Sequence, residues 1–286
     1  MALRILTAVV MGSAVVALVW WAPPALLAAI AAIVSIVALR EFFDLGERVG
    51  LRAFRKWTMV CAAAIFYAQY CAGLQETRHF GDAILVRLGS TIPSPLSVET
   101  VLLIFLFGAV GIGLATRRPL HEVLPSMSIS AAGLLLIVLP FSYLVRINEI
   151  VRAGRQLVLF TLCLIWAGDM LAYFVGRSLG RVPMAPALSP KKTWEGAFAN
   201  LLASLLVAGA FARWLQADAT MLLVMAGMAN VAGQMGDLIE SAYKRGAAVK
   251  DSSSLLPGHG GMLDRIDSLI LASPVVWIAW QWLVAR

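Results

Sequence analysis

The sequence has little charge. Only 14% of its 286 residues are Asp, Glu, Lys or Arg, and 60% are hydrophobic, whereas a soluble globular domain typically carries about 25% charged residues. Apolar windows long enough to cross a bilayer recur from end to end. They do not alternate polar and apolar residues, as the strands of a membrane β-barrel would. This composition excludes an ordinary soluble domain and predicts an all-α polytopic integral membrane protein.

Cysteine and histidine are also scarce. The three cysteines fall in or beside apolar runs and lack metal-ligand spacing, so we interpret them as small buried hydrophobes rather than as a disulfide framework. Three histidines offer little to zinc, which prefers Cys or several His. Neither GxxxxGK[ST] nor GxGxxG occurs, which excludes the common nucleotide-binding loops. These residues are Cys61, Cys71, Cys163, His79, His121 and His259.

Hydropathy predicts about nine transmembrane helices. The first is interpreted as a retained span rather than a signal peptide, because bulky Trp20 and Trp21 stand where a cleavage site needs small residues. The predicted organisation is a three-span unit at 1–75, a two-span unit with an external loop at 76–155, and a four-span catalytic unit at 156–286. The nine spans are 4–21, 24–43, 57–73, 98–116, 127–145, 157–175, 196–215, 219–240 and 267–285.

Basic residues are distributed unevenly between the two sides of this predicted topology. If the N-terminus is inside, 16 of the 23 Lys and Arg residues fall in cytoplasmic segments, as the positive-inside rule expects. Anionic lipid headgroups account for the net charge of +7, so no nucleic-acid partner is needed.

In the last 130 residues or so, carboxylates enter apolar segments: Asp169, Asp237 and Glu240. A charge at the centre of a membrane helix costs at least about 2.5 kcal/mol on insertion scales, so such residues usually face a wet cavity or a cation. Snorkelling from a helix end is the alternative. Asp169 is followed at i+4 and i+8 by Tyr173 and Arg177, which predicts one helical stripe.

Two further polar clusters fall on the same predicted cytoplasmic side. In "SPKKTWEG", Lys191 and Lys192 supply positive charge and Thr193 is expected to cap the next helix. In the second cluster, Asp237 shares a helix face with Ser241 and Lys244, and "PGHGG" follows, where glycines let backbone amides approach a ligand. After it come Asp264, Asp267 and Ser268.

Carboxylates beside Lys, Arg and a glycine-rich loop favour a divalent cation that holds a polyphosphate. Magnesium binds through one or two carboxylates, waters and substrate phosphates. Two simpler interpretations remain: the carboxylates only neutralise basic residues, or Ser241, His259 and Asp264 form a hydrolase triad, although no nucleophile elbow marks one.

"SAYKRGAAVKDSSSLLPGHGGMLDRID", residues 241–267, resembles the signature of the phosphatidate cytidylyltransferase (CDP-diacylglycerol synthase) family. "SPKKTWEG" and "GDMLAYFVGRSLGR" resemble two further blocks of that family, so the likeness covers roughly 160–274. Two positions depart from the pattern. Tyr243 replaces an aliphatic residue, and Met170 stands where a small hydroxyl residue is common.

The resemblance implies that CTP and phosphatidic acid react to CDP-diacylglycerol and pyrophosphate with Mg2+. It also implies a bacterial-type inner (plasma) membrane and an active site that faces the cytoplasm. The lipid phosphate is already a nucleophile, so the protein mainly positions and neutralises two anions. The resemblance leaves open whether a monovalent cation such as K+ is also bound and whether the protein is a homodimer.

Matching the motifs residue by residue assigns the expected roles. The resemblance implies metal ligands at Asp237 and Asp264, and we add Asp267 and Asp251 as second-choice ligands or orienting carboxylates. It also implies catalytic roles for Asp237, Asp264, Lys250, Asp251 and Arg265. The implied substrate-binding residues are Lys191, Lys192, Ser241, Lys244, Arg245, His259, Gly260 and Gly261.

Other functions stay open on the sequence alone. A CTP-dependent lipid kinase would release CDP instead of pyrophosphate. CDP-alcohol phosphotransferases use a DGxxAR-type aspartate spacing that is absent here. An ion-coupled transporter could use Asp169, Asp237 and Glu240, but its ionisable groups are expected near the midplane rather than in cytoplasmic loops.

Overall fold

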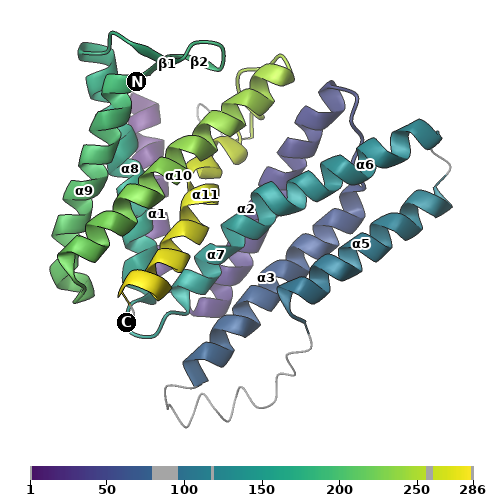
Figure 1. Ribbon diagram of the computed structural model, residues 1–286, viewed down its shortest axis with the longest axis horizontal. Helices are drawn as coiled ribbons and strands as arrows, with labels where there is room; N and C mark the ends of the chain where they lie inside the picture. Colours follow the sequence, from purple (N-terminus) through teal and green to yellow (C-terminus); the bar gives the residue numbers. More distant parts are fainter. Residues whose placement is uncertain (1, 79–95, 117–118, 256–259, 285–286) are drawn as a thin grey trace. The chain divides into compact units, whose positions relative to one another are not determined.

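The protein is almost entirely helical in the computed structural model, which describes residues 2–78, 96–116, 119–255 and 260–284 (Figure 1). It divides into two compact units. The first comprises residues 1–154 together with 251–263, and the second comprises 155–250 together with 264–286. The finer division into three parts stays a prediction.

The described residues of the first unit form six α-helices and a π-helical segment. Helix α3 packs against α2, α5 and α7, and α2 also contacts α6 and α7. Pro24 starts α2, where the missing N–H of proline costs nothing. The Ser97 hydroxyl accepts the Thr100 N–H at 3.2 Å and caps α5. The bounds are α1 Ala2–Trp21, α2 Pro24–Arg48, α3 Arg55–Arg78, α5 Val98–Ala115, α6 Leu120–Gly133, η1 Leu134–Val138 and α7 Leu139–Asn148.

One membrane-length helix of this unit contains the π-helical turn. The segments α6, η1 and α7 form a continuous run from Leu120 to Asn148. Pro140 follows the π turn at the start of α7. Proline cannot donate a backbone hydrogen bond, and a local π adjustment accommodates it inside a helix.

The described residues of the second unit form four α-helices, a π-helical segment and a small hairpin. Helices α9 and α10 pack together, and small residues on their buried faces, such as Ala203 and Ala229, allow close approach in a membrane. The bounds are α8 Gly154–Ser178, β1 Pro183–Ala185, β2 Ser189–Thr193, α9 Trp194–Leu215, α10 Ala219–Gly246, α11 Leu263–Ala279 and η2 Trp280–Val284.

The "SPKKT" segment forms an antiparallel strand pair that the sequence did not indicate. Strand β2 pairs with β1, with Thr193 opposite Pro183 and Ser189 opposite Ala185. The expected cap is confirmed: the Thr193 hydroxyl accepts the Gly196 N–H at 3.2 Å. The strand pairing and the helix cap together fix the backbone positions of Lys191 and Lys192 just before α9 begins.

The prediction of a polytopic all-α membrane protein is confirmed. Among the described residues, seven helical segments are long and apolar enough to span a membrane: 24–48, 55–75, 98–115, 120–148, 154–178, 194–215 and 219–246. Helix α11 has 17 residues before its π-helical end, and the apolar part of α1 within the described side chains is Val10–Trp21. The count of nine spans stays a prediction.

Candidate active site

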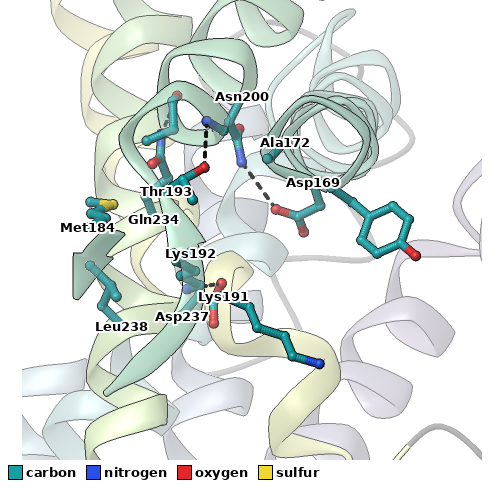
Figure 2. A pocket seen from close by; sticks show the side chains of 14 residues that line it. Asp169, Ala172, Met184, Lys191, Lys192, Thr193, Asn200, Gln234, Asp237 and Leu238 are labelled. Atoms are coloured by element: carbon teal, nitrogen blue, oxygen red, sulfur yellow. Dashed lines mark hydrogen bonds and ion pairs between the residues drawn. The ribbon is translucent and has the colours of Figure 1, made fainter. Parts of the chain in front are cut away.

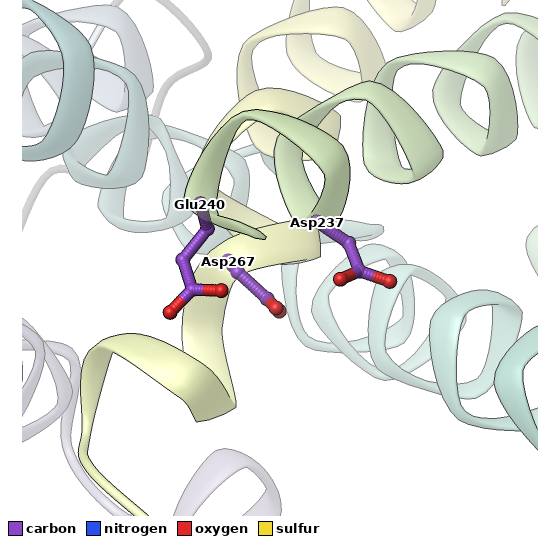
Figure 3. Close-up of side chains that lie close together, drawn as sticks. All are labelled: Asp237, Glu240 and Asp267. Atoms are coloured by element: carbon purple, nitrogen blue, oxygen red, sulfur yellow. The ribbon is translucent and has the colours of Figure 1, made fainter. Parts of the chain in front are cut away.

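Three carboxylates converge where α10 meets α11. Asp237 and Glu240 come from α10 and Asp267 comes from α11, and one oxygen of each lies within 4.8 Å of the others (Figure 3). The two helices approach closely at Gly236, where an added Cβ would collide with the backbone carbonyl of Asp267. One carboxylate oxygen of Asp267 accepts the Ser268 N–H at 2.7 Å.

A buried lysine holds two acidic side chains beside this cluster. Lys244 Nζ lies 2.5 Å from Glu240 Oε2 and 2.5 Å from Asp264 Oδ1. The three side chains are 12%, 3% and 6% exposed, respectively. Glu240 Oε1 is buried and accepts no hydrogen bond from the residues that the structure describes. A buried carboxylate oxygen without a hydrogen-bond donor favours a cation nearby.

A cavity of about 280 Å3 adjoins the cluster through Asp237. Helices α8, α9 and α10 and the hairpin supply its walls. Lys192 forms an ion pair with Asp237 in the wall, and both side chains are about one third exposed or less. Lys191 and Asp169 also line the cavity (Figure 2). It therefore combines lysine ammonium groups with carboxylates, the charges that a metal-bound polyphosphate requires.

An amide network in the cavity wall orients Asp169. Asn200 Nδ2 donates to Asp169 Oδ1 at 3.2 Å, and Asn230 Nδ2 donates to Asn200 Oδ1 at 2.5 Å. Gln234 Nε2 donates to Asn230 Oδ1 at 2.6 Å. Each amide fixes the next, so the Asn200 side chain must present a donor to Asp169. The polar residues Asn200, Asn230 and Gln234 inside apolar helices were a signal that the sequence analysis did not use.

The expected α8 stripe is present in part. Asp169 and Tyr173 both line the cavity, and Arg177 Nη1 donates to the Tyr173 hydroxyl at 2.8 Å. Met170 is 62% exposed. The polar stripe therefore leads from Asp169 toward the end of α8.

The structure brings some predicted site residues together and leaves others apart. Asp264 pairs with Lys244 instead of joining the three-carboxylate cluster, and Glu240 takes the third place there. Glu240 lies at i+3 from Asp237, a spacing that could have indicated it. Ser241 is buried next to Glu240 in the chain, and Arg265 is exposed at the start of α11. The metal-binding role of Asp264 stays a prediction.

The remaining predicted residues lie in connecting segments. Arg245 donates to the carbonyls of Leu188 and Val249 at 3.1 and 2.9 Å, so its guanidinium braces the hairpin connection. Lys250 and Asp251 are exposed. Gly260 has a left-handed φ of 77°, a conformation that glycine adopts without steric cost. His259 lies outside the described residues. Asp251, Gly260 and Gly261 fold with the first unit.

Comparison with known proteins identifies the family of this arrangement. Residues 2–283 match the sequence profile of the cytidylyltransferase family. A phosphatidate cytidylyltransferase of Brucella abortus is 32% identical over 280 residues, which cover 96% of this chain and 91% of that protein.

Shorter matches have higher identity. The phosphatidate cytidylyltransferase of Bacillus subtilis is 40% identical over 139 residues, and that of Haemophilus influenzae is 45% identical over 127 residues. These matches cover 48% and 42% of this chain and about half of each relative, 52% and 44%. With a profile match along nearly its whole length, the chain belongs to the cytidylyltransferase family of enzymes.

Proposed function

We propose that this protein transfers the cytidylyl group of CTP to phosphatidic acid, giving CDP-diacylglycerol and pyrophosphate at the cytoplasmic face of a bacterial inner membrane. One observation carries the proposal: three converging carboxylates adjoin a lysine-lined cavity whose walls are membrane-length helices and a hairpin. The relatives described as phosphatidate cytidylyltransferases agree with it. The excess of Lys and Arg in the predicted cytoplasmic segments supports the orientation.

The residues present fit a magnesium ion. Mg2+ takes oxygen ligands and is commonly held by one or two carboxylates together with substrate phosphates. Asp237, Glu240 and Asp267 offer such oxygens within 4.8 Å of one another, and the buried Glu240 Oε1 lacks a donor among the described residues. When bound, the ion would supply positive charge to the triphosphate and to the phosphate charge that develops in the reaction.

The protein's own side chains would bind and orient the two anionic substrates. Lys191 and Lys192 line the cavity, and their ammonium groups would offset the repulsion between triphosphate and lipid phosphate. Asn200, the first member of the amide network, donates directly to Asp169 and fixes its carboxylate. A lipid phosphate oxygen then forms a bond to the α-phosphorus of CTP, and the bond from that phosphorus to the α–β bridging oxygen breaks. Pyrophosphate leaves with the electron pair.

No protein nucleophile is required, because the attacking oxygen already carries negative charge. The acyl chains of phosphatidic acid stay in the bilayer while CTP arrives from water, so the site has to be reached from both. Positioning of the two reactants then provides much of the rate enhancement.

The decisive test uses purified protein in mixed micelles with Mg2+ and CTP, with and without phosphatidic acid. Pyrophosphate release and the CDP-lipid are measured in the same samples, the latter by mass spectrometry. We expect both products only when lipid and metal are present together, and neither from Asp237→Asn. CDP release without pyrophosphate on a lipid alcohol would identify a kinase instead. Folded protein that is silent with phosphatidic acid would refute the proposal.

A further inference from the structure

A single buried carboxylate in the first unit accepts an unusual number of hydrogen bonds. Glu41 lies on α2 and is only 4% exposed. Its Oε2 accepts the Ser252 hydroxyl at 2.9 Å and the Leu263 N–H at 2.8 Å. Its Oε1 accepts the Ser253 hydroxyl at 2.6 Å and the Met262 N–H at 3.0 Å. Burial of this charge is thus compensated by four donors.

The donors come from both ends of one segment. Ser252 and Ser253 open it, and Met262 and Leu263 close it, more than 200 residues after Glu41 in the chain. We call these four hydrogen bonds the Glu41 clamp. Since one carboxylate takes donors from both ends, it joins the start of the segment to its end, and the two ends cannot separate without breaking bonds to a charged group.

The Glu41 clamp also caps a helix. Helix α11 begins at Leu263, and the first backbone N–H groups of a helix have no acceptor within that helix. Glu41 accepts the N–H of Leu263 and of the preceding Met262. A carboxylate at this position also interacts favourably with the positive end of the helix dipole. An N-cap residue usually accepts these N–H groups from a neighbouring position in the chain. Here a side chain of α2 accepts them instead.

The same contact requires glycine at position 261. A Cβ at this position would collide with the Ser252 hydroxyl and lie 2.5 Å from Glu41 Oε2. Only glycine lets the backbone before α11 pass this close to the carboxylate. The requirement for glycine in "HGG" therefore has a local explanation in the Glu41 clamp, separate from any contact of the loop with nucleotide.

We propose that Glu41 is a positioning residue for the reaction, an inference that rests on the proposed function. Helix α11 carries Asp264 and Asp267 in its first two turns, and Asp267 is one of the three converging carboxylates. Because Glu41 fixes the first residue of α11, it sets the start, and so the rotational phase, of the helix that presents these aspartates. Glu41 acts through the backbone and touches no reacting atom.

The test compares Glu41→Gln with Glu47→Gln. Glu47 is a 49% exposed acid on the same helix, paired with Arg55, so its variant is a matched control for the loss of one charge. Hydrogen–deuterium exchange of residues 260–267 in detergent micelles reports the clamp directly, without any substrate. We expect about tenfold faster exchange in Glu41→Gln, because amides lose a charged acceptor, and wild-type exchange in Glu47→Gln.

Steady-state kinetics tests the positioning role. We expect kcat for pyrophosphate release to fall roughly 10- to 100-fold in Glu41→Gln, as for other groups that orient site residues, while KM for CTP changes less than about threefold. Glu41→Asp, which keeps the charge, should recover part of this loss. Ser253→Ala should lower kcat modestly in the wild-type background and by a smaller factor in the Glu41→Gln background, because both changes weaken the same contact.

The outcomes separate the inference from the proposed function. Unchanged exchange in Glu41→Gln would overturn the clamp. Faster exchange with wild-type kcat, or additive effects of Ser253→Ala and Glu41→Gln, would overturn the positioning role. Folded wild-type protein that makes no CDP-lipid would refute the proposed function, and the exchange experiment would still decide whether the clamp exists. If Glu41→Gln does not fold, Ser253→Ala supplies the same comparison with one donor removed.

Discussion

Replacing Lys244 by methionine should destabilise the second unit strongly. Its ammonium group is the common partner of Glu240 and Asp264, at 2.5 Å from each, and all three side chains are at most 12% exposed. Methionine keeps most of the side-chain volume, so the change removes charge without opening a large cavity. Two buried carboxylates then face each other without the cation between them.

The expected cost follows from burial. Removing one partner of a buried ion pair costs about 3–5 kcal/mol, because the remaining charge is desolvated and unpaired. Lys192→Met is the matched control, since Lys192 also pairs with an α10 carboxylate, Asp237, but the two side chains are 27% and 31% exposed. Water screens this pair, and its loss should cost about 1 kcal/mol or less.

Apparent melting temperatures in detergent, measured at one scan rate in EDTA, compare the two variants. With about 2–4 °C per kcal/mol for a protein of this size, Lys244→Met should melt roughly 6–20 °C below wild type and Lys192→Met within about 4 °C. Equal shifts for both variants, or a wild-type melting temperature for Lys244→Met, would refute the buried-pair reasoning.

Three other changes test separate features. Asp267→Asn should lower pyrophosphate release roughly 100-fold. The melting temperature should stay equal or rise, because repulsion with Asp237 is relieved. Activity within threefold of wild type would exclude Asp267 as a ligand. Gly236→Ala should cost about 1–3 kcal/mol by overpacking against α11. Gly227→Ala, on the same helix with nothing within 4 Å of the added Cβ, should be neutral or stabilising in the same melting assay. Burial raises the pKa of Glu149 from 4.5 to about 7, so the folded state binds the proton more tightly than the unfolded chain does. Stability should therefore fall by up to about 3 kcal/mol between about pH 4.5 and pH 7. Glu149→Gln should remove that fall and melt above wild type at pH 8 but not at pH 4, and a parallel pH profile for both proteins would contradict this assignment.

Local patterns predicted the helices and part of the site well. Long apolar runs determine where membrane helices form, since unpaired backbone groups are too costly in lipid. The Thr193 cap was predictable because capping depends on residues three positions apart. The shared face of Asp237 and Lys244 follows from helix geometry alone, and Lys244 does lie against Glu240 one turn away.

Contacts between distant segments could not be predicted from the same patterns. Glu240 joins Asp237 and Asp267 only because α11 passes against Gly236, and no spacing along α10 reveals that passage. Lys192 reaches Asp237 because "SPKKT" is a strand of a hairpin, not a simple loop. Glu41 accepts bonds from residues more than 200 positions away, so the sequence alone marks it only as one acid in an apolar helix.

The pairing of charges in the second unit bears on why a cation is expected there. Lys244 is shared by Glu240 and Asp264, Lys192 pairs with Asp237, and Asp267 has no ion pair among the described residues. In these ion pairs of the described residues, carboxylates outnumber ammonium groups. An excess of negative charge in membrane helices is costly. A divalent cation offsets that charge, and a bound triphosphate then supplies the negative charge that the lysines pair with. On this reasoning metal and nucleotide should stabilise the protein against heat more together than the sum of each alone.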